Sequence, residues 1–546
     1  MRSRVIFIEI VFCLLSIAII FKLYDIQVKK HSFYQVKAKY QTEHSLKKKE
    51  GWRGDIFIKR GENLIPLAIS KFFPALYLEP NKIRKPREVE ERILSLFNDI
   101  PKEELERKIN KKNDPYELVK KRLSKEEAEK IESWHLEGVG VEERVERFYP
   151  LKNFASHLVG FVSQNEKGEW QGRYGLEKFY DQELKEGYDL VLTIEKSIQE
   201  ISEKILRELI EEWQGEGGQI IVAKPKTGEI LAMASYPDFD PNQYSKYPLK
   251  NFLNPNVESV WEPGSVFKVI TMSAGLDSEA IKTETTYNDT GQVILDGKTI
   301  RNWNDQANGV QTMTDILAKS LNTGAVFVQR KLGKEKFLEY IKKFNLNKKT
   351  GIDLPGEIKG LLSNLEDEGR DIDFATASFG QGIAVTPIEM LIAINAIAND
   401  GLILKPFIVK KIISPKGKIK TKEKEVEKRA IKKTTALTVK KMMIEAVKHG
   451  KIAEIKGYDL AGKTGTAQVA YQGKYLDQYI HSYVGFGPAE NPQFIILIKL
   501  DKPKKGHLSG ITVVPAFKKL AQFMLNYFNL PPKKINNSPP SSTAQE

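Results

Sequence analysis

A Pro-Gly pair followed directly by an apolar run is the feature that most restricts how this chain can fold. Residues 261–268 read Trp-Glu-Pro-Gly-Ser-Val-Phe-Lys, and apolar residues continue to Met272. Proline suits the first turn of a helix and glycine permits a sharp entry, so we expect Ser265 at the N-terminus of a buried helix. Lys268 follows on the same face, one turn later. The segment therefore predicts a hydroxyl and an amine side by side, near unpaired N–H groups at the positive end of the helix dipole.

This arrangement suits a serine whose proton is removed by a lysine. The S-x-x-K pattern alone is weak, because a second match, Ser45 to Lys48, lies in a basic run with no apolar helix behind it. We interpret that second match as solvated surface. For Ser265 the competing interpretation is a helix N-cap, with Lys268 as a surface charge. Other motifs have to decide between the two.

The totals indicate a globular protein of two or three domains, since the chain has 546 residues, of which 41% are hydrophobic and 29% charged. A net charge of +14 favours an anionic surface such as phospholipid or cell-wall polymer. We find no nucleic-acid recognition motif and expect no nucleic acid partner. The single cysteine, Cys13, excludes a disulfide within the chain. We also expect no metal site and no cofactor.

The N-terminus has the pattern of a membrane anchor. Residues 5–26 are mostly apolar and long enough for one span. Two arginines in residues 1–4 favour a cytoplasmic N-terminus, although lysines between 22 and 30 favour the opposite. The alternative is a cleaved signal peptide, but no small-x-small site follows the apolar run. We expect one uncleaved anchor in the inner membrane and a catalytic domain on its periplasmic or extracellular side.

The polar region 27–195 carries no obvious catalytic motif, and we interpret it as a stalk or pedestal. Residues 53–62 have the pattern of strand, turn and strand. Between 86 and 135 charged residues recur with helical spacing, and Ser124 with Glu127 forms a capping box. The region is therefore expected to be α+β.

From residue 196 to 530 the pattern becomes that of a second, larger domain. Apolar residues at i+3 and i+4 predict a helix over 197–213, and a Pro-containing turn joins two strands over 219–234. Further expected elements are helices within 312–344, 387–399 and 516–528 and strands at 481–487 and 493–500. The tail, 531–546, is rich in Pro, Ser and Asn and should be disordered.

A second motif is Ser320-Leu321-Asn322, just inside the helical region. A hydroxyl and an amide two residues apart can relay a proton and hold a substrate amide. Alone, the pair is equally well explained as the polar side of a helix. Ser163-Gln164-Asn165 has the same pattern but precedes Ser265 in the chain.

The third motif, Lys-Thr-Gly, occurs three times. The run that begins at Lys226 is a hairpin turn, and the run that begins at Lys349 is a loop after a helix. Only the run at 463–467 continues into a strand-like stretch. That strand would place Lys463 and Gly465 on one side.

Thr464 and Thr466 would then lie on the other side of the strand. A glycine in a strand permits close approach of a ligand backbone. We therefore assign substrate binding to Lys463, Thr464, Gly465 and Thr466.

S-x-x-K, S-x-N and K-T-G in this order, 55 and 143 residues apart, resemble the signature of penicillin-binding proteins and serine β-lactamases. Further segments resemble the class B penicillin-binding proteins, which are monofunctional peptidoglycan transpeptidases. These segments are Arg53-Gly54-Asp55-Ile56, Arg147-Phe148-Tyr149-Pro150, Tyr174-Gly175-Leu176-Glu177 and 379–387. The Glu-Pro-Gly-Ser and Gly380-Gln381-Gly382 runs are more similar to the division-type, FtsI-like branch than to the elongation branch. Val266 departs from the pattern, where threonine is frequent.

The resemblance implies a multidomain α+β protein with a transmembrane helix, a dimerisation-type pedestal and a transpeptidase domain. In that domain an antiparallel sheet is flanked by helices and joined to an all-helical subdomain. Ser265 would be the nucleophile, Lys268 its base, and Ser320 the proton relay to the leaving amine. Asn322 would hold the substrate backbone.

The family also implies that Lys463 and Thr464 bind the terminal carboxylate of the substrate. Backbone N–H groups of Ser265 and Thr466 would form the oxyanion hole. The implied partners are peptidoglycan stem peptides, β-lactams, the cytoplasmic membrane, a polytopic lipid II polymerase and other division proteins.

Several alternatives remain open on the sequence. An elongation-type transpeptidase and a D,D-carboxypeptidase, which transfers to water, use the same motifs. A β-lactamase is less compatible, because no E-x-x-L-N run is present. A β-lactam sensor would need an output domain ahead of the anchor. A wall-binding scaffold with an inactive site is opposed by the intact motifs.

Overall fold

The computed structural model describes residues 52–166, 168–366, 369–471 and 473–533, with 6, 13–16, 19 and 24 near the N-terminus. The expected N-terminus 1–4, most of the expected anchor 5–26, the Ser45 to Lys48 run and the tail beyond residue 533 lie outside these ranges. Among the described residues, no helix has both the length and the apolarity that crossing a membrane requires.

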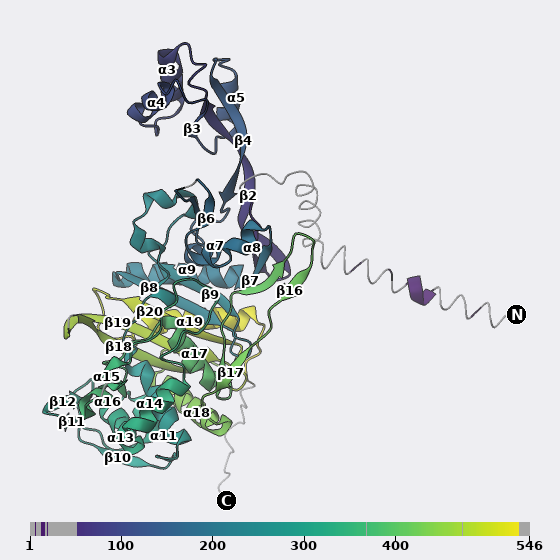
Figure 1. Ribbon diagram of the computed structural model, residues 1–546. Helices are drawn as coiled ribbons and strands as arrows, with labels where there is room; N and C mark the ends of the chain where they lie inside the picture. Colours follow the sequence, from purple (N-terminus) through teal and green to yellow (C-terminus); the bar gives the residue numbers. More distant parts are fainter. Residues whose placement is uncertain are drawn as a thin grey trace, which may run out of the picture.

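The pedestal is elongated and rises from a larger catalytic body (Figure 1). Two long antiparallel strands, β2 (Asn63–Leu78) and β4 (Val139–Phe148), carry a small head away from the body. The head consists of α3 (Pro86–Leu96), α4 (Lys102–Ile109), β3 (Glu117–Lys120) and α5 (Lys125–Glu132). The predicted capping box is present, since Ser124 Oγ accepts the Glu127 N–H at 3.1 Å and the Glu127 carboxylate accepts the Ser124 N–H at 2.7 Å.

A mixed seven-stranded sheet runs from the base of the pedestal into its head, with the order β16-β15-β7-β1-β2-β3, and β4 also pairs with β2. The pedestal strands and helices here are β1 (Ile56–Arg60), α6 (Ser156–Val159), β5 (Val162–Gln164), β6 (Trp170–Gly172), α7 (Gly175–Phe179), α8 (Asp181–Lys185) and β7 (Asp189–Glu195). Two strands of this sheet, β15 (Val409–Ile413) and β16 (Ile419–Thr421), come from a segment more than 200 residues after β7 in the sequence. Residues 409–421 thus complete the pedestal sheet although they fall inside the range expected for the catalytic domain.

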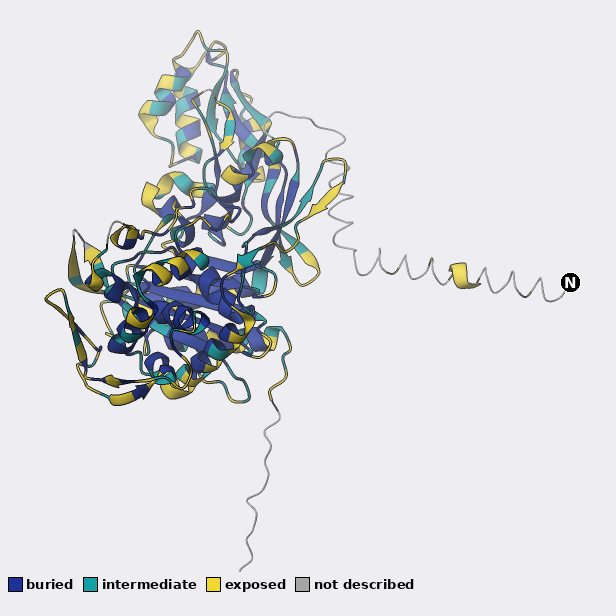
Figure 2. Ribbon diagram, turned by 60° about the horizontal axis from the view of Figure 1, so that its bottom comes forward, coloured by how far each residue is buried: buried dark blue, intermediate teal, exposed yellow. Residues whose placement is uncertain are grey.

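The catalytic body is built on an antiparallel sheet, as the resemblance implied, and this sheet has five strands. Its order is β18-β19-β20-β8-β9, with β18 (Ala461–Tyr471), β19 (Lys474–Gly487), β20 (Phe494–Asp501), β8 (Gly217–Ala223) and β9 (Ile230–Tyr236). Strand β19 begins at Lys474, earlier than the expected 481. Its first residues are mostly exposed and therefore lack the apolar pattern on which the prediction depended. In Figure 2 the central strands carry the dark blue of buried residues.

Helices cover both faces of this sheet, which explains why its central strands are continuously apolar. On one face, α9 (Lys196–Trp213) and α19 (Val513–Tyr527) pack against the sheet in one apolar cluster. On the other face lie α11 (Lys268–Asp277) and α17 (Pro387–Ala398). Every residue of α17 is buried, as expected for a helix that is apolar all round.

A smaller subdomain surrounds the S-x-N motif. It contains α12 (Met313–Ala318), α13 (Asn322–Leu332), α14 (Lys334–Lys343), α15 (Ser363–Glu366) and α16 (Asp371–Ala377). It also contains the strand pairs β10 (Thr286–Asp289) with β13 (Gly309–Thr312) and β11 (Gln292–Leu295) with β12 (Lys298–Arg301). The expectation of an all-helical subdomain is therefore wrong, because two short antiparallel strand pairs pack beside α13.

The remaining elements connect these layers. They are the short helices η2 (Pro241–Lys246), η3 (Leu249–Phe252) and α10 (Pro255–Glu258), the strands β14 (Leu402–Leu404) and β17 (Val426–Arg429), and the long helix α18 (Lys433–Gly450).

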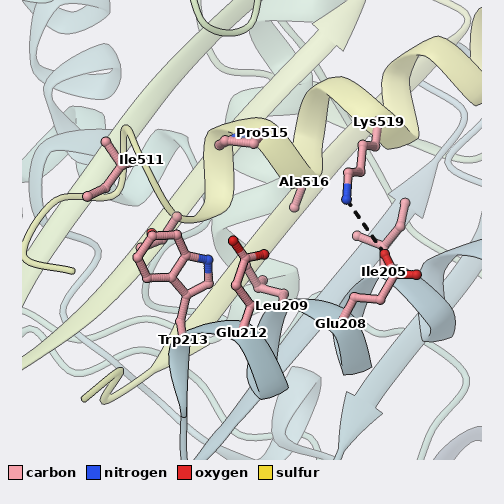
Figure 3. A pocket seen from close by; sticks show the side chains of 10 residues that line it. Ile205, Glu208, Leu209, Glu212, Trp213, Ile511, Pro515, Ala516 and Lys519 are labelled. Carbon is pink, nitrogen blue, oxygen red and sulfur yellow. Dashed lines mark ion pairs between the residues drawn. The ribbon is translucent and has the colours of Figure 1, made fainter. Parts of the chain in front are cut away.

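A pocket of about 60 Å³ opens between α9 and α19 (Figure 3). Trp213 and Ile511 line it, and Lys519 bridges the two helices to Glu208 at 3.6 Å. None of its lining residues belongs to the three motifs.

Candidate active site

Ser265 lies on a tight turn that leads into a buried helix, close to the expected position. The turn is the 3₁₀ helix η4 (Gly264–Phe267), and α11 begins directly after it at Lys268. A 3₁₀ helix has three residues per turn, so side chains three apart lie on one line. Ser265 and Lys268 therefore share a face.

Lys268 is buried, with 1% of the residue exposed. Its amine donates to the Ser320 carbonyl at 2.6 Å and to Asn322 Oδ1 at 2.8 Å. A third, longer contact at 3.3 Å joins it to Ser320 Oγ. These contacts exclude the surface-charge interpretation of Lys268 and bring the first two motifs together.

Lys463 reaches the same hydroxyl from strand β18. It is 3% exposed, and its amine donates to Ser320 Oγ at 3.0 Å and to Thr464 Oγ1 at 3.2 Å. Ser320 Oγ thus lies between the amines of Lys268 and Lys463. All three motifs meet at this atom.

Burial controls the charge of the two amines. It lowers the pKa of Lys268 far below that of a free lysine, and the neighbouring charge of Lys463 lowers it further. Burial also lowers the pKa of Lys463 to about 7. Both amines therefore lose a proton more easily than a free lysine does, and repulsion from Lys463 acts on Lys268 in addition to burial.

Ser320 does not lie inside a helix, which corrects the expectation from the sequence. It follows the end of α12 with φ +57°, in the left-handed region, and the Leu321 N–H donates to the Ile316 carbonyl at 3.0 Å. This is the hydrogen bond of a Schellman helix end, where glycine is the usual left-handed residue. A serine there is strained. The turn separates α12 from α13, which begins at Asn322.

Strand β18 alternates as predicted, with Lys463 and Gly465 buried and Thr464 and Thr466 partly exposed. Gly465 is also required by contacts within the chain. A Cβ there would lie 2.4 Å from Ser482 Oγ and 2.8 Å from the Pro263 carbonyl. The turn before Ser265 therefore needs a glycine at this position.

The rival motifs do not reach the site. Lys226 is exposed in the turn between β8 and β9, and Lys349 is exposed in the loop after α14. Ser163 lies in the β5–β6 hairpin of the pedestal. The structure thus selects Lys463 from the three Lys-Thr-Gly runs.

Sequence analysis missed the contacts of Glu262. Its carboxylate accepts the Gly382 N–H at 3.1 Å and the Tyr475 hydroxyl at 3.2 Å. It therefore joins the turn before Ser265, the 379–387 segment and the tip of the β18–β19 hairpin. Its acidic side chain beside the Pro-Gly pair was visible in the sequence, but its partners, more than 100 residues away, were not.

Known proteins share both parts of this architecture. Residues 218–522 match the penicillin binding protein transpeptidase domain, and residues 48–209 match the penicillin-binding protein dimerisation domain. The chain is 33% identical over 498 residues to stage V sporulation protein D of Bacillus subtilis, across 84% of this chain and 76% of that protein. It is 30% identical over 477 residues to peptidoglycan D,D-transpeptidase FtsI of Buchnera aphidicola, across 81% of this chain and 80% of that protein.

A solved structure shows the same fold. The crystal structure of penicillin-binding protein 3 from Mycobacterium tuberculosis with aztreonam has a TM-score of 0.70 and 26% identity, and the match covers 89% of this chain and 98% of that one. The family predicted from the motifs is confirmed. The chain belongs to the penicillin-binding proteins, as a class B transpeptidase of the FtsI type with a dimerisation domain ahead of its catalytic domain.

Proposed function

We propose that this protein cross-links peptidoglycan stem peptides through a serine acyl-enzyme during septal wall synthesis. The observation that carries this proposal is the position of Ser320 Oγ between two buried lysine amines, beside the turn of Ser265. A base, a proton relay and a cation in one place are what acyl transfer from an amide requires.

The first step forms the acyl-enzyme. Ser265 Oγ attacks the carbonyl between the two terminal D-alanines and gives its proton to the neutral amine of Lys268. The ester bond to Ser265 forms and the amide C–N bond breaks. Ser320 donates its proton to the nitrogen of the leaving D-alanine and takes up the proton that Lys268 received, so that Lys268 is neutral again. An amine from a neighbouring stem then attacks the ester, forms the cross-link and returns the proton to Ser265.

Other groups bind the substrate. The ammonium of Lys463 and the hydroxyl of Thr464 suit the terminal carboxylate, and Asn322 suits the substrate backbone. The N–H groups of Ser265 and Thr466 would form the oxyanion hole, and one such donor contributes about 3 kcal/mol. Because β-lactams mimic the D-alanyl-D-alanine amide, they would acylate Ser265 irreversibly.

Septal synthesis is supported by similarity to proteins named FtsI. Residues 5–26 would anchor the protein in the inner membrane, with 1–4 in the cytoplasm. The pedestal, 27–195, would place the catalytic domain, 196–530, at the wall, with 531–546 as its tail. A polytopic lipid II polymerase and other division proteins are the expected partners.

Labelled penicillin tests the nucleophile. The wild-type protein should become covalently labelled, and folded Ser265→Ala protein should not. Labelling that survives this change would place the nucleophile elsewhere. Release of D-alanine with and without an acceptor amine separates a transpeptidase from a carboxypeptidase, and rapid hydrolysis of the drug would indicate a β-lactamase. Depletion in the host should give filaments, whereas round cells would indicate an elongation role.

A further inference from the structure

We propose that Asp289 and Asn302 are positioning residues that orient the side chain of Asn322 and, through it, the amine of Lys268. Neither belongs to the three motifs, and neither touches Lys268. This inference rests on the proposed function, because it assigns Lys268 the role of base.

Asp289, at the end of β10, is a buried centre of hydrogen bonds with 1% of the residue exposed. Its carboxylate accepts the Gly291 N–H at 3.0 Å and the Thr323 hydroxyl at 2.7 Å. It also accepts the side-chain amides of Asn302 at 2.9 Å and Asn308 at 2.6 Å. Burial raises the pKa of Asp289, but these donors outweigh it and hold the pKa below its usual value. A charged carboxylate therefore fixes the NH₂ end of Asn302.

Asn302 caps α13 from a distance. With its NH₂ group turned to Asp289, its carbonyl oxygen accepts the N–H of Asn322 at 3.0 Å and of Thr323 at 3.3 Å. The residue at the cap position, Leu321, has no side chain that can accept a hydrogen bond, and α13 has no local side-chain cap. Asn302 therefore supplies the acceptor that the first turn of α13 lacks.

The same peptide segment orients the Asn322 side chain. Asn322 Nδ2 donates to the Arg301 carbonyl at 2.8 Å, and this turns Asn322 Oδ1 towards Lys268 Nζ, also at 2.8 Å. A reversed amide would present two N–H donors to an amine that is itself a donor. The chain of contacts thus runs from Asp289 through Asn302 and Asn322 to the base.

A double-mutant cycle with Asn322→Ala tests this inference. Penicillin acylation is measured on equal amounts of folded protein. Asn302→Ala should slow acylation about tenfold or more. In the Asn322→Ala background the same change should add less than about twofold, because its effect passes through Asn322. If the two changes instead slowed acylation independently, so that their factors multiplied in the double variant, the inference would be overturned.

The pH profile gives a second readout that lost stability alone does not change. Asn322 Oδ1 accepts a hydrogen bond from Lys268 and so favours the protonated amine. Releasing Asn322 should lower the pKa of Lys268 and move the acidic limb of acylation to lower pH in Asn302→Ala, which leaves the charge of the protein unchanged. An unmoved limb would contradict the inference.

Two further variants complete the design. Asp289→Asn, nearly isosteric, replaces Asn302→Ala in the double-mutant cycle if the latter does not fold, with the same outcomes expected; it is not used for the pH profile, because it removes a charge. The matched control is Asp315→Asn, which removes a carboxylate from the capping box of α12 in the same subdomain. It should leave acylation within about threefold. A wild-type protein that is not labelled at Ser265 would overturn the proposed function as well, whereas wild-type labelling with unaffected Asn302 and Asp289 variants would overturn the positioning role alone.

Discussion

Two groups of buried charged side chains in this molecule are built differently. At the base of the pedestal, arginines and carboxylates alternate in one hydrogen-bonded cluster. In the catalytic site, two lysines approach each other, and no carboxylate contributes to the pKa shift of either amine. The first arrangement balances its charges, whereas the second leaves like charges together in a buried place.

Glu177, which is fully buried, is the centre of the pedestal cluster. Its carboxylate accepts Arg147 Nε at 2.6 Å and Arg53 Nε at 3.2 Å, and Arg53 also donates to Asp181 at 2.8 Å. Arg53, Arg147 and Glu177 come from the three short pedestal segments that resemble class B penicillin-binding proteins. Because each charge is paired, the cluster can hold the pedestal strands and helices together without any role in chemistry.

The catalytic lysines differ from this cluster. Burying Lys268 beside Lys463 without a countercharge costs free energy, and buried groups with strongly shifted pKa values are typical of catalytic sites. Of these two groups, the one with paired charges is structural and the one with unpaired lysines is the reactive site.

The largest predicted effect is on stability in the pedestal. Glu177→Ala leaves two buried guanidinium groups without their carboxylate, so the free energy of unfolding should fall by about 3–5 kcal/mol. Denaturant unfolding measures it. The matched control, Glu186→Ala at the exposed end of α8, should change it by less than about 0.5 kcal/mol. A loss at Glu177 no larger than the control would remove the structural role from this cluster.

The second effect is on the rate of acylation. Lys463→Ala removes the cation that faces the substrate carboxylate and lets the pKa of Lys268 rise, so acylation by penicillin should fall about a hundredfold. Lys226→Ala and Lys349→Ala change the exposed Lys-Thr-Gly runs and should stay within about threefold. If either matched the loss at Lys463, the choice of substrate-binding strand would be wrong.

A third effect separates the two lysines by pH. Acylation by free enzyme requires neutral Lys268 and charged Lys463, so its second-order rate should rise through the lowered pKa of Lys268 and fall again near pH 7, where Lys463 loses its proton. Lys463→Arg should remove the alkaline limb, because a guanidinium stays charged. An alkaline limb that persists in this variant would assign it to another group.

The smallest effect is a gain in stability. The unfolded chain protonates Lys268 at neutral pH, whereas burial disfavours this proton in the folded state, so Lys268→Met should stabilise the protein by about 1 kcal/mol while it abolishes acylation. The gain should be present at neutral pH and disappear as the pH rises towards 10.5, the usual pKa of lysine. Unfolding at several pH values measures it; a gain independent of pH would instead reflect better packing of methionine.

Much of the local structure was predictable because it depends on near neighbours. The Ser124 capping box, the amphipathic α9 and the alternation of β18 follow from spacing within one element. The conformation of Ser320 was not predicted. Its left-handed φ ends α12, and serine seldom occupies that position. Strands β15 and β16 were also not assigned to the pedestal, because the pairing of β15 with β7 joins residues more than 200 apart in the chain.

The sequence by itself determined the reactive groups of this protein. The order and identity of Ser265, Lys268, Ser320 and Lys463 identified the family and its chemistry, because a nucleophile, a base and a carboxylate-binding cation are fixed by side-chain type. Tertiary structure decided what state those groups are in. Burial, the convergence of both amines on Ser320 Oγ and the support from Asp289 and Asn302 arise from contacts between distant segments, and such contacts leave no periodic signal in the chain.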